Sequence, residues 1–145
     1  MFILFLSKKS CLSQIISLSE KTGTSAIALN KIDKANIHKY GVIKPGIINN
    51  KIIQISDMVE KPLAKNAPSD IAILGRYVFT PSIFKYLKNL KPSVGGEVQL
   101  TDAIKLMLYD ENVVGYLYEG KKFDCGSRHG YVNAIQYLAK ETLDD

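Results

Sequence analysis

Short apolar segments alternate with helix-like patterns along this chain, and this alternation constrains its fold more than any other feature. Strands are predicted for residues 2–6, 25–30, 40–43, 71–79, 113–118 and 121–126. Helices are expected after Ser10, from Thr80-Pro81, at 101–110 and at 127–143. The Asn49-Asn50 pair lies between two apolar pieces and predicts a turn, so two strands follow one another near the middle. This order is typical of an α/β fold with a mixed sheet.

Residue spacing also predicts where strands stop and which helix sides are buried. Lys44-Pro45-Gly46 is expected to close the strand that begins at Tyr40. The helix expected from Thr80-Pro81 and the one expected at 127–143 should each bury one apolar stripe. The first stripe comprises Ile83, Phe84 and Leu87, and the second comprises Val132, Ile135, Leu138 and Ala139.

Length and charge limit the kinds of function that the chain can have. Its 145 residues, 46% of them hydrophobic, fit one domain or part of a larger one. The net charge is +5, but the lysines are scattered and no run exceeds two. Proteins that bind nucleic acid concentrate basic residues on one face, so we expect no nucleic-acid partner. One or two lysines facing an anionic small molecule would suit this pattern.

The cysteines, histidines and N-terminal segment point to a cytoplasmic protein. Cys11 and Cys125 are far apart, and neither they nor His38 and His129 have the spacing of a disulfide framework or a metal site. The apolar run at the start is shorter than the core of a signal peptide, about 7–15 residues. It is also too short to span a bilayer. We therefore expect reduced cysteines and no membrane partner.

The sequence Glu60-Lys61-Pro62 follows an expected strand directly. Open α/β sheets bind their ligands where strands end, and proline restricts the backbone next to the two charged residues. A carboxylate can accept hydrogen bonds from neighbouring hydroxyls of a sugar, and an ammonium group suits a phosphate. The pair is a candidate sugar-phosphate site, although the same three residues also occur in polar surface turns.

Three further signals are each open to a second interpretation. Gly41 would allow a ligand to approach the backbone closely, or it marks a bulge. Asp124 would bind Mg²⁺, or it caps the helix that follows. The segment 95–102, "GGEVQLTD", suits a sugar-binding loop, or it caps a helix through Thr101 or a neighbour.

Together, the order and spacing of these pieces resemble the bacterial UTP–glucose-1-phosphate uridylyltransferases, the UDP-glucose pyrophosphorylases. The matching pieces are "TGTSAIAL", "KYGVI", "MVEKP", "APSDIAILGRYVFTPSIF", "GGEVQLTDAI" and "FDCGSRHGY". The resemblance runs from about Cys11 to the C-terminus, and residues 1–9 look like an unrelated start. It implies a partial Rossmann-like nucleotidyltransferase fold, in which residues 1–145 would be the C-terminal, sugar-phosphate-binding part of the nucleotidyltransferase domain.

The resemblance also implies roles for individual residues. Glu60 would bind glucose hydroxyls, and Lys61 would bind the sugar phosphate and act as the catalytic residue. Gly41 would contact the sugar, and Asp124 would be one of two carboxylates on Mg²⁺. Two residues of the "AILGRY" strand, Ile73 and Tyr77, are expected to line the sugar pocket.

Other parts of the family's pattern have no match in this chain. The nucleotide-binding half with its glycine-rich loop is missing, and Ser7-Lys8-Lys9 stands where the first metal-binding acid is expected. We therefore expect a truncated uridylyltransferase that binds glucose 1-phosphate or UDP-glucose and is inactive alone. A homo-oligomer, or pairing with the missing N-terminal half, would complete it. The alternative is a non-catalytic remnant or a module that pairs with an intact subunit.

Overall fold

The computed structural model describes residues 3–88, 90–92 and 96–143, which form two compact units. The larger unit, residues 12–118, contains nearly all of α1 (Cys11–Thr22) and the elements β2 (Ser25–Lys31), β3 (Gly41–Asn49), β4 (Ile52–Glu60), β5 (Ile71–Val78), α2 (Ile83–Leu87), α3 (Leu100–Asp110) and β6 (Val113–Leu117). Two short 3-10 helices, Lys34–Lys39 and Ala64–Asn66, connect strands. The smaller unit contains β1 (Ile3–Leu6), β7 (Lys121–Asp124) and α4 (Arg128–Leu143).

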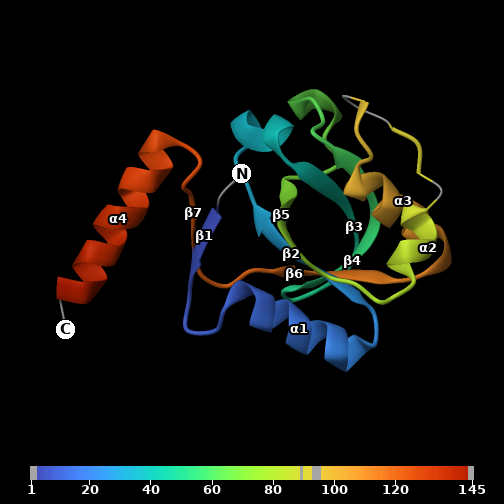
Figure 1. The fold of residues 1–145 in the computed structure, drawn as a ribbon, viewed down its shortest axis with the longest axis horizontal. Coiled ribbons are helices and arrows are strands. Elements are labelled where there is room, and N and C mark those ends of the chain that lie inside the picture. Colours follow the sequence, from blue (N-terminus) through green and yellow to red (C-terminus); the bar gives the residue numbers. More distant parts are fainter. Residues whose placement is uncertain (1–2, 89, 93–95, 144–145) are drawn as a thin grey trace. The chain divides into compact units, whose positions relative to one another are not determined.

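The five strands of the larger unit close into a barrel in the order β2-β5-β3-β4-β6 (Figure 1). The β2–β6 pair is parallel and the other pairs are antiparallel, which confirms the mixed sheet. Its closure was not predicted, because it depends on Ile52–Gln54 of β4 pairing with β6. Register shifts on both sides of Pro45 bend the β3–β4 hairpin, as bulges do in small barrels.

The expected end of β3 at Lys44-Pro45-Gly46 was wrong, since the strand continues to Asn49. Pro45 lies at the irregular part of the ladder, where its missing N–H does not interrupt a regular pair. A turn joins β3 to β4 as expected, but it comprises Asn50 and Lys51, since Asn49 is the last residue of β3 and pairs with Ile52. Asn50 takes the left-handed backbone at φ 55°.

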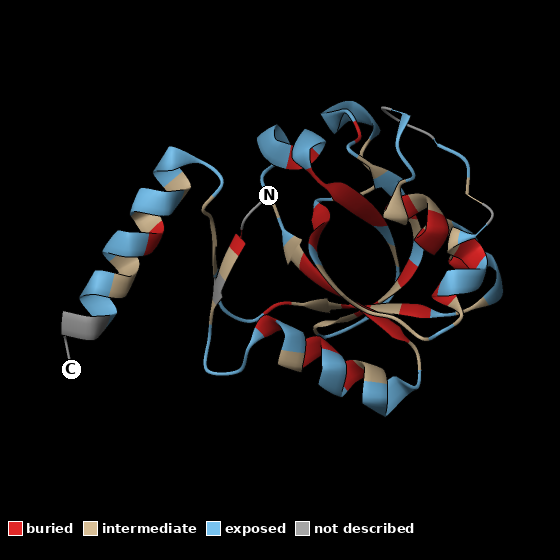
Figure 2. Cartoon of the chain, in the orientation of Figure 1, coloured by how far each residue is buried: buried red, intermediate tan, exposed pale blue. Residues whose placement is uncertain are grey.

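The core of the larger unit joins the barrel to α2 and α3 (Figures 1 and 2). Ile27 and Leu29 of β2 are fully buried, as are Ile104 and Met107 of α3. Side chains of this size each contribute about 1.5–3 kcal/mol when they leave water. The barrel therefore holds β3, β4, β5 and the start of α3 in a fixed arrangement.

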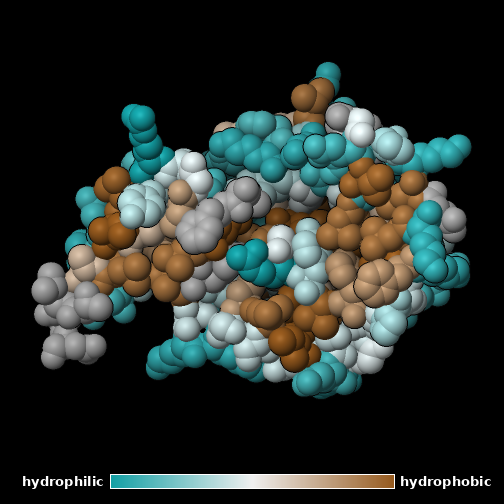
Figure 3. Space-filling model, in the orientation of Figure 1, coloured by the Kyte–Doolittle hydropathy of each residue, from teal (hydrophilic) through white to brown (hydrophobic). Residues whose placement is uncertain are grey.

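Helix α2 is only five residues long and buries Ile83 and Tyr86, so the prediction for Phe84 was wrong. Phe84 is 65% exposed, and Leu87 is partly buried against the core. The Tyr86 hydroxyl donates to Asp110 Oδ2 at 2.9 Å and to Glu111 Oε1 at 3.2 Å, which allows a tyrosine to turn inward. Apolar side chains gather on the outer surface over α2 and α3 in Figure 3.

In the smaller unit, β1 and β7 form an antiparallel pair from Ile3–Asp124 to Leu6–Lys121. Helix α4 packs on β7 through the rings of Phe123 and Tyr137, whose centroids are 5.5 Å apart. The predicted stripe of α4 was largely wrong. Val132 and Ile135 are about half exposed, Leu138 is half-buried, Ala139 is exposed, and Ala134 is buried instead.

Cys11 and Cys125 are both free, and Cys125 is only partly buried. No helix within the described ranges carries an apolar stretch long enough to cross a bilayer.

Candidate functional site

The start of β3 and the end of β4 place Gly41 directly opposite Glu60. The strands stay connected one residue further, because the Lys61 N–H donates to the Tyr40 carbonyl at 3.0 Å. Pro62, which follows, is buried. The backbone of Glu60 and Lys61 is thus hydrogen-bonded to β3 and to Tyr40, and the buried Pro62 follows directly.

The two oxygens of the Glu60 carboxylate have different surroundings. Oε2 accepts a hydrogen bond from the Thr101 hydroxyl at 2.6 Å, across 41 residues of sequence. Oε1 lies 4.0 Å from the Lys61 ammonium nitrogen. The Glu60 side chain is 20% exposed and that of Lys61 is 59% exposed, so the ion pair itself is weak. One carboxylate oxygen is therefore held by Thr101, while the other lies toward the exposed ammonium group of Lys61.

Gly41 is required by the position of this carboxylate. A Cβ at Gly41 would lie 3.0 Å from Glu60 Oε2 and 3.2 Å from Ile73 Cδ1. Both distances are shorter than ordinary van der Waals contact, so a side chain at this position would displace Glu60 or Ile73. Gly41, Glu60, Ile73 and Thr101 are thus brought together, and Gly41 leaves the space that lets Glu60 pack against β3.

Tyr77 lies on β5 beyond a bulge. Ile27 and Leu29 of β2 pair with Tyr77 and Ile73 of β5, so β5 has two extra residues between these pairs. Gly75 lies in this bulge and has φ 69°. Burial, and to a smaller extent the Glu60 charge, raise the pKa of Tyr77 to about 12. Tyr77 also stacks on Phe79 with ring centroids 5.4 Å apart. The structure therefore places Tyr77 within the electrostatic reach of Glu60.

An ionisation experiment checks this placement of Tyr77. The folded state favours the protonated hydroxyl, because the pKa is raised from 10.0 to about 12. Its contribution to stability is present below pH 10 and is lost as the pH rises through about 12. In an absorbance titration of tyrosinate, Tyr77→Phe should remove one group that ionises near pH 12. Glu60→Gln should lower the pKa of Tyr77 only partly, since burial is the larger cause. An unchanged pKa would mean that the Glu60 charge does not act on Tyr77.

Lys61 has an unusual backbone conformation, with φ 43°. Residues with a Cβ rarely adopt the left-handed region, and doing so costs about 1–2 kcal/mol. Such strain persists only where the surrounding structure enforces it, and it is concentrated at functional sites. The bond from the Lys61 N–H to Tyr40 and the burial of Pro62 enforce it here.

Two substitutions at Lys61 separate this strain from the role of the ammonium group. Lys61→Gly should be about 1 kcal/mol more stable than Lys61→Ala in urea unfolding, because glycine adopts the left-handed region without a Cβ clash. Both variants lack the ammonium group, so they should have the same Kd for a ligand that binds through this group. Asn50→Gly and Asn50→Ala, at φ 55°, are the matched pair outside the site. Equal stabilities for the two Lys61 variants would contradict the left-handed conformation.

Asp124 is the last residue of β7 and belongs to the smaller unit. Its Oδ1 accepts the Gly126 N–H at 3.1 Å, and its carbonyl accepts the Ser127 hydroxyl at 3.0 Å. Asp124 thus organises the turn into α4 with one carboxylate oxygen. Within the described residues, no group of three or more His, Cys, Asp or Glu side chains could hold a metal ion. That Asp124 binds Mg²⁺ next to the Glu60 ligand stays a prediction.

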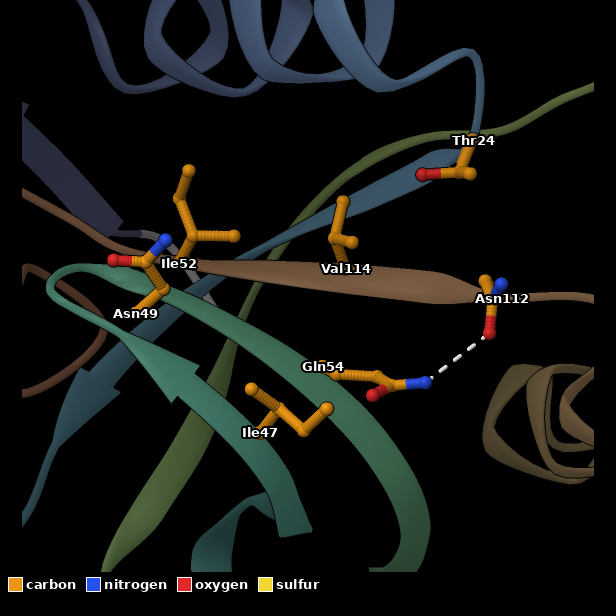
Figure 4. Close-up of a pocket in the computed structure, with 7 residues that line it drawn as sticks. All are labelled: Thr24, Ile47, Asn49, Ile52, Gln54, Asn112 and Val114. Atoms are coloured by element: carbon orange, nitrogen blue, oxygen red, sulfur yellow. Dashed lines mark hydrogen bonds between the residues drawn. The ribbon is translucent and has the colours of Figure 1, made fainter.

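A pocket of about 340 Å³ lies elsewhere on the barrel (Figure 4). Most of the surface exposed in this pocket is apolar, although its lining includes polar residues; the lining comprises Thr24, Ile47, Asn49, Ile52, Gln54, Asn112 and Val114. Gln54 donates a hydrogen bond to Asn112 at 3.2 Å inside it. The lining residues include no lysine or arginine to attract a phosphate, and none of the predicted site residues is among them.

Sequence reasoning missed the contact between Thr101 and Glu60. It expected Thr101 or a neighbour to cap the helix, but the N-cap residue is Gln99, two positions earlier, and the Gln99 side chain makes no cap hydrogen bond. Thr101 is the second residue of α3, and its hydroxyl is directed to Glu60 instead. Of the polar segment 95–102, Gly95 lies outside the described residues. No local pattern signals a partner this far away in sequence.

Comparison with known proteins gives matches over most of the chain. A family model described as nucleotidyl transferase matches residues 6–141. A UTP–glucose-1-phosphate uridylyltransferase of Pseudomonas aeruginosa is 40% identical over 126 residues, which are 87% of this chain and 45% of the relative. One of Komagataeibacter xylinus is 41% identical over 122 residues, 84% of this chain and 43% of the relative.

Solved structures agree with these sequence matches. A UDP-glucose pyrophosphorylase complexed with UDP-glucose has a TM-score of 0.89 at 36% identity, over 96% of this chain and 53% of that one. The UDP-glucose pyrophosphorylase of Acinetobacter baumannii has a TM-score of 0.81 at 30% identity, over 96% of this chain and 48% of that one. The predicted resemblance and fold class are confirmed. The chain spans about half the length of the relatives that it matches.

Proposed function

The chain belongs to the nucleotidyl transferase family, and on that premise we propose that it is the sugar-phosphate-binding half of a UTP–glucose-1-phosphate uridylyltransferase. The observation that carries the proposal is the Glu60 carboxylate, held on one side by Thr101 and lying 4.0 Å from Lys61 on the other. The relatives named for this activity support the choice of substrate.

The geometry suits the two ends of glucose 1-phosphate. The Oε1 atom of Glu60 would accept hydrogen bonds from ring hydroxyls, and the exposed Lys61 ammonium would bind the phosphate. Ile73 and Tyr77 would line the sugar side of the same site. These residues orient the phosphate for reaction, which is the main way in which protein groups accelerate phosphoryl transfer.

The reaction proposed for the complete enzyme is a single displacement. A phosphate oxygen of glucose 1-phosphate bonds to the α-phosphorus of UTP, and the bond to pyrophosphate breaks with its electrons leaving on the pyrophosphate. Lys61 would act as the catalytic residue by holding the attacking phosphate and reducing the repulsion between the two anions. No covalent intermediate with the protein is needed.

A bound Mg²⁺ would neutralise charge on the phosphate oxygens. Asp124 would help to hold the ion. Among the described residues its carboxylate accepts one hydrogen bond, at Oδ1 from the Gly126 N–H. Mg²⁺ requires only one or two carboxylates when phosphates and waters complete its shell. Further ligands would have to come from the phosphates and from water, since the described residues form no group of three or more His, Cys, Asp or Glu side chains that could hold the ion.

A pair of measurements tests the proposal on the 145-residue chain. Calorimetric titration should show binding of glucose 1-phosphate, while incubation with UTP, glucose 1-phosphate and Mg²⁺ should yield no UDP-glucose. The second expectation follows because the chain spans only about half of its relatives. Absence of glucose 1-phosphate binding would contradict the proposed site, and UDP-glucose formation by the pure chain would contradict its dependence on a further half.

A further inference from the structure

The hydrogen bond between Thr101 and Glu60 connects helix α3 to the end of strand β4. Thr101 is 8% exposed, and the distance from its hydroxyl to Glu60 Oε2 is 2.6 Å. A hydroxyl–carboxylate bond of this length is charge-assisted and about twice as strong as a bond between neutral groups. Its burial raises the cost of leaving either partner unpaired.

This bond determines which oxygen of Glu60 is available. The threonine hydroxyl has a single hydrogen, which it donates to Oε2, and the backbone of Gly41 packs beside the same oxygen. Oε1 remains, on the side of the Lys61 ammonium. We infer that Thr101 is a positioning residue, which orients Glu60 so that Oε1 faces the hydroxyls of the sugar phosphate. The inference rests on the proposed function.

Packing and hydrogen bonding by Thr101 can be separated by substitution. The Thr101 methyl carbon lies 3.5 Å from the point that a Cβ on Gly41 would occupy, so the methyl group fills space next to β3. Thr101→Val keeps this shape and removes the hydroxyl, whereas Thr101→Ser keeps the hydroxyl and removes the methyl. A residue that acts through the hydrogen bond should be rescued by serine and not by valine.

Calorimetric titration of glucose 1-phosphate into the 145-residue chain measures this difference. Thr101→Val should raise the Kd about tenfold, within the range for a hydrogen bond to a charged group, and Thr101→Ser should recover most of the affinity. Thr101→Ala replaces the valine variant if that variant does not fold. Thr22→Val removes an exposed hydroxyl of α1, bonded to the Leu18 carbonyl, and should leave the Kd unchanged.

A double-mutant cycle tests whether Thr101 acts through Glu60. In a Glu60→Ala background, Thr101→Val should have no further effect on the Kd. Three results would overturn the inference: wild-type affinity of Thr101→Val, equal weakening by the serine and valine variants, or a further tenfold loss in the Glu60→Ala background.

The ionisation of Tyr77 keeps this test independent of the proposed function. If the wild-type chain binds no glucose 1-phosphate, the proposed function fails, but the orientation of Glu60 can still be measured. The Glu60 charge contributes to the raised pKa of Tyr77. Thr101→Val should release Glu60 and so change that pKa, and Thr101→Ser should leave it unchanged. An unchanged Tyr77 pKa in the valine variant would show that Thr101 does not position Glu60.

Discussion

Replacing Glu60 by alanine should weaken glucose 1-phosphate binding by about 1–3 kcal/mol, the range for losing charge-assisted hydrogen bonds. That loss corresponds to roughly a five- to 150-fold rise in Kd. The effect should be large because Glu60 supplies a carboxylate that is largely shielded from water and already oriented by Thr101. Calorimetric titration of the folded variant measures it directly.

The same strand provides a matched control for Glu60. Asp57 is also on β4, and its carboxylate is 3.2 Å from the Lys105 ammonium, with both side chains about 40% exposed. Asp57→Ala removes a carboxylate of equal charge and should leave the Kd unchanged. Equal effects of the two substitutions would mean that Glu60 acts only through net charge, and an unchanged Kd in Glu60→Ala would exclude it from the site.

Replacing Gly130 by alanine should give the largest loss of stability. Gly130 is in the first turn of α4, and a Cβ there would overlap the Asp124 carbonyl oxygen and lie 2.7 Å from its carbonyl carbon. The Ser127 hydroxyl both donates to that carbonyl and accepts the Gly130 N–H, so the clash would break a linked pair of bonds. Backbone atoms cannot turn aside as a side chain can. We expect a loss of about 2–4 kcal/mol in urea unfolding followed by circular dichroism.

The neighbouring residue in the same helix serves as the control for Gly130. His129 is exposed, and His129→Ala should change the free energy of unfolding by no more than about 0.5 kcal/mol. A Gly130→Ala variant as stable as His129→Ala would contradict the close contact between α4 and the turn at Asp124.

The strands and their neighbours in sequence were predictable because their signals are local. Alternating apolar segments, the turn between β3 and β4 and the strand end at Glu60 all follow from residues close together in the chain. The closure of the barrel was not predictable, since it depends on pairing between β4 and β6, which are far apart in sequence. In the five-residue helix α2, too few turns exist for spacing to define a buried side, and hydrogen bonds of Tyr86 decided it.

The candidate site likewise has features that the sequence predicts and features that it does not. Gly41, Glu60 and Lys61 were predicted together, and the β3–β4 pairing brings them together. Neither the left-handed backbone of Lys61 nor the bond from Thr101 to Glu60 has a sequence signal. The first depends on how Tyr40 and Pro62 anchor the segment, and the second on how α3 packs against the barrel. Both are consequences of tertiary structure.

Mapping the ligand by nuclear magnetic resonance tests the central claim most directly. Glucose 1-phosphate is added to the isotope-labelled chain, and the backbone amide shifts of its residues are followed. The account predicts that the amides of Gly41, Lys61 and Thr101 shift together with a single Kd. Shifts confined to the apolar pocket, at Asn49, Gln54 and Asn112, would contradict it, as would no shift at any concentration of the sugar phosphate.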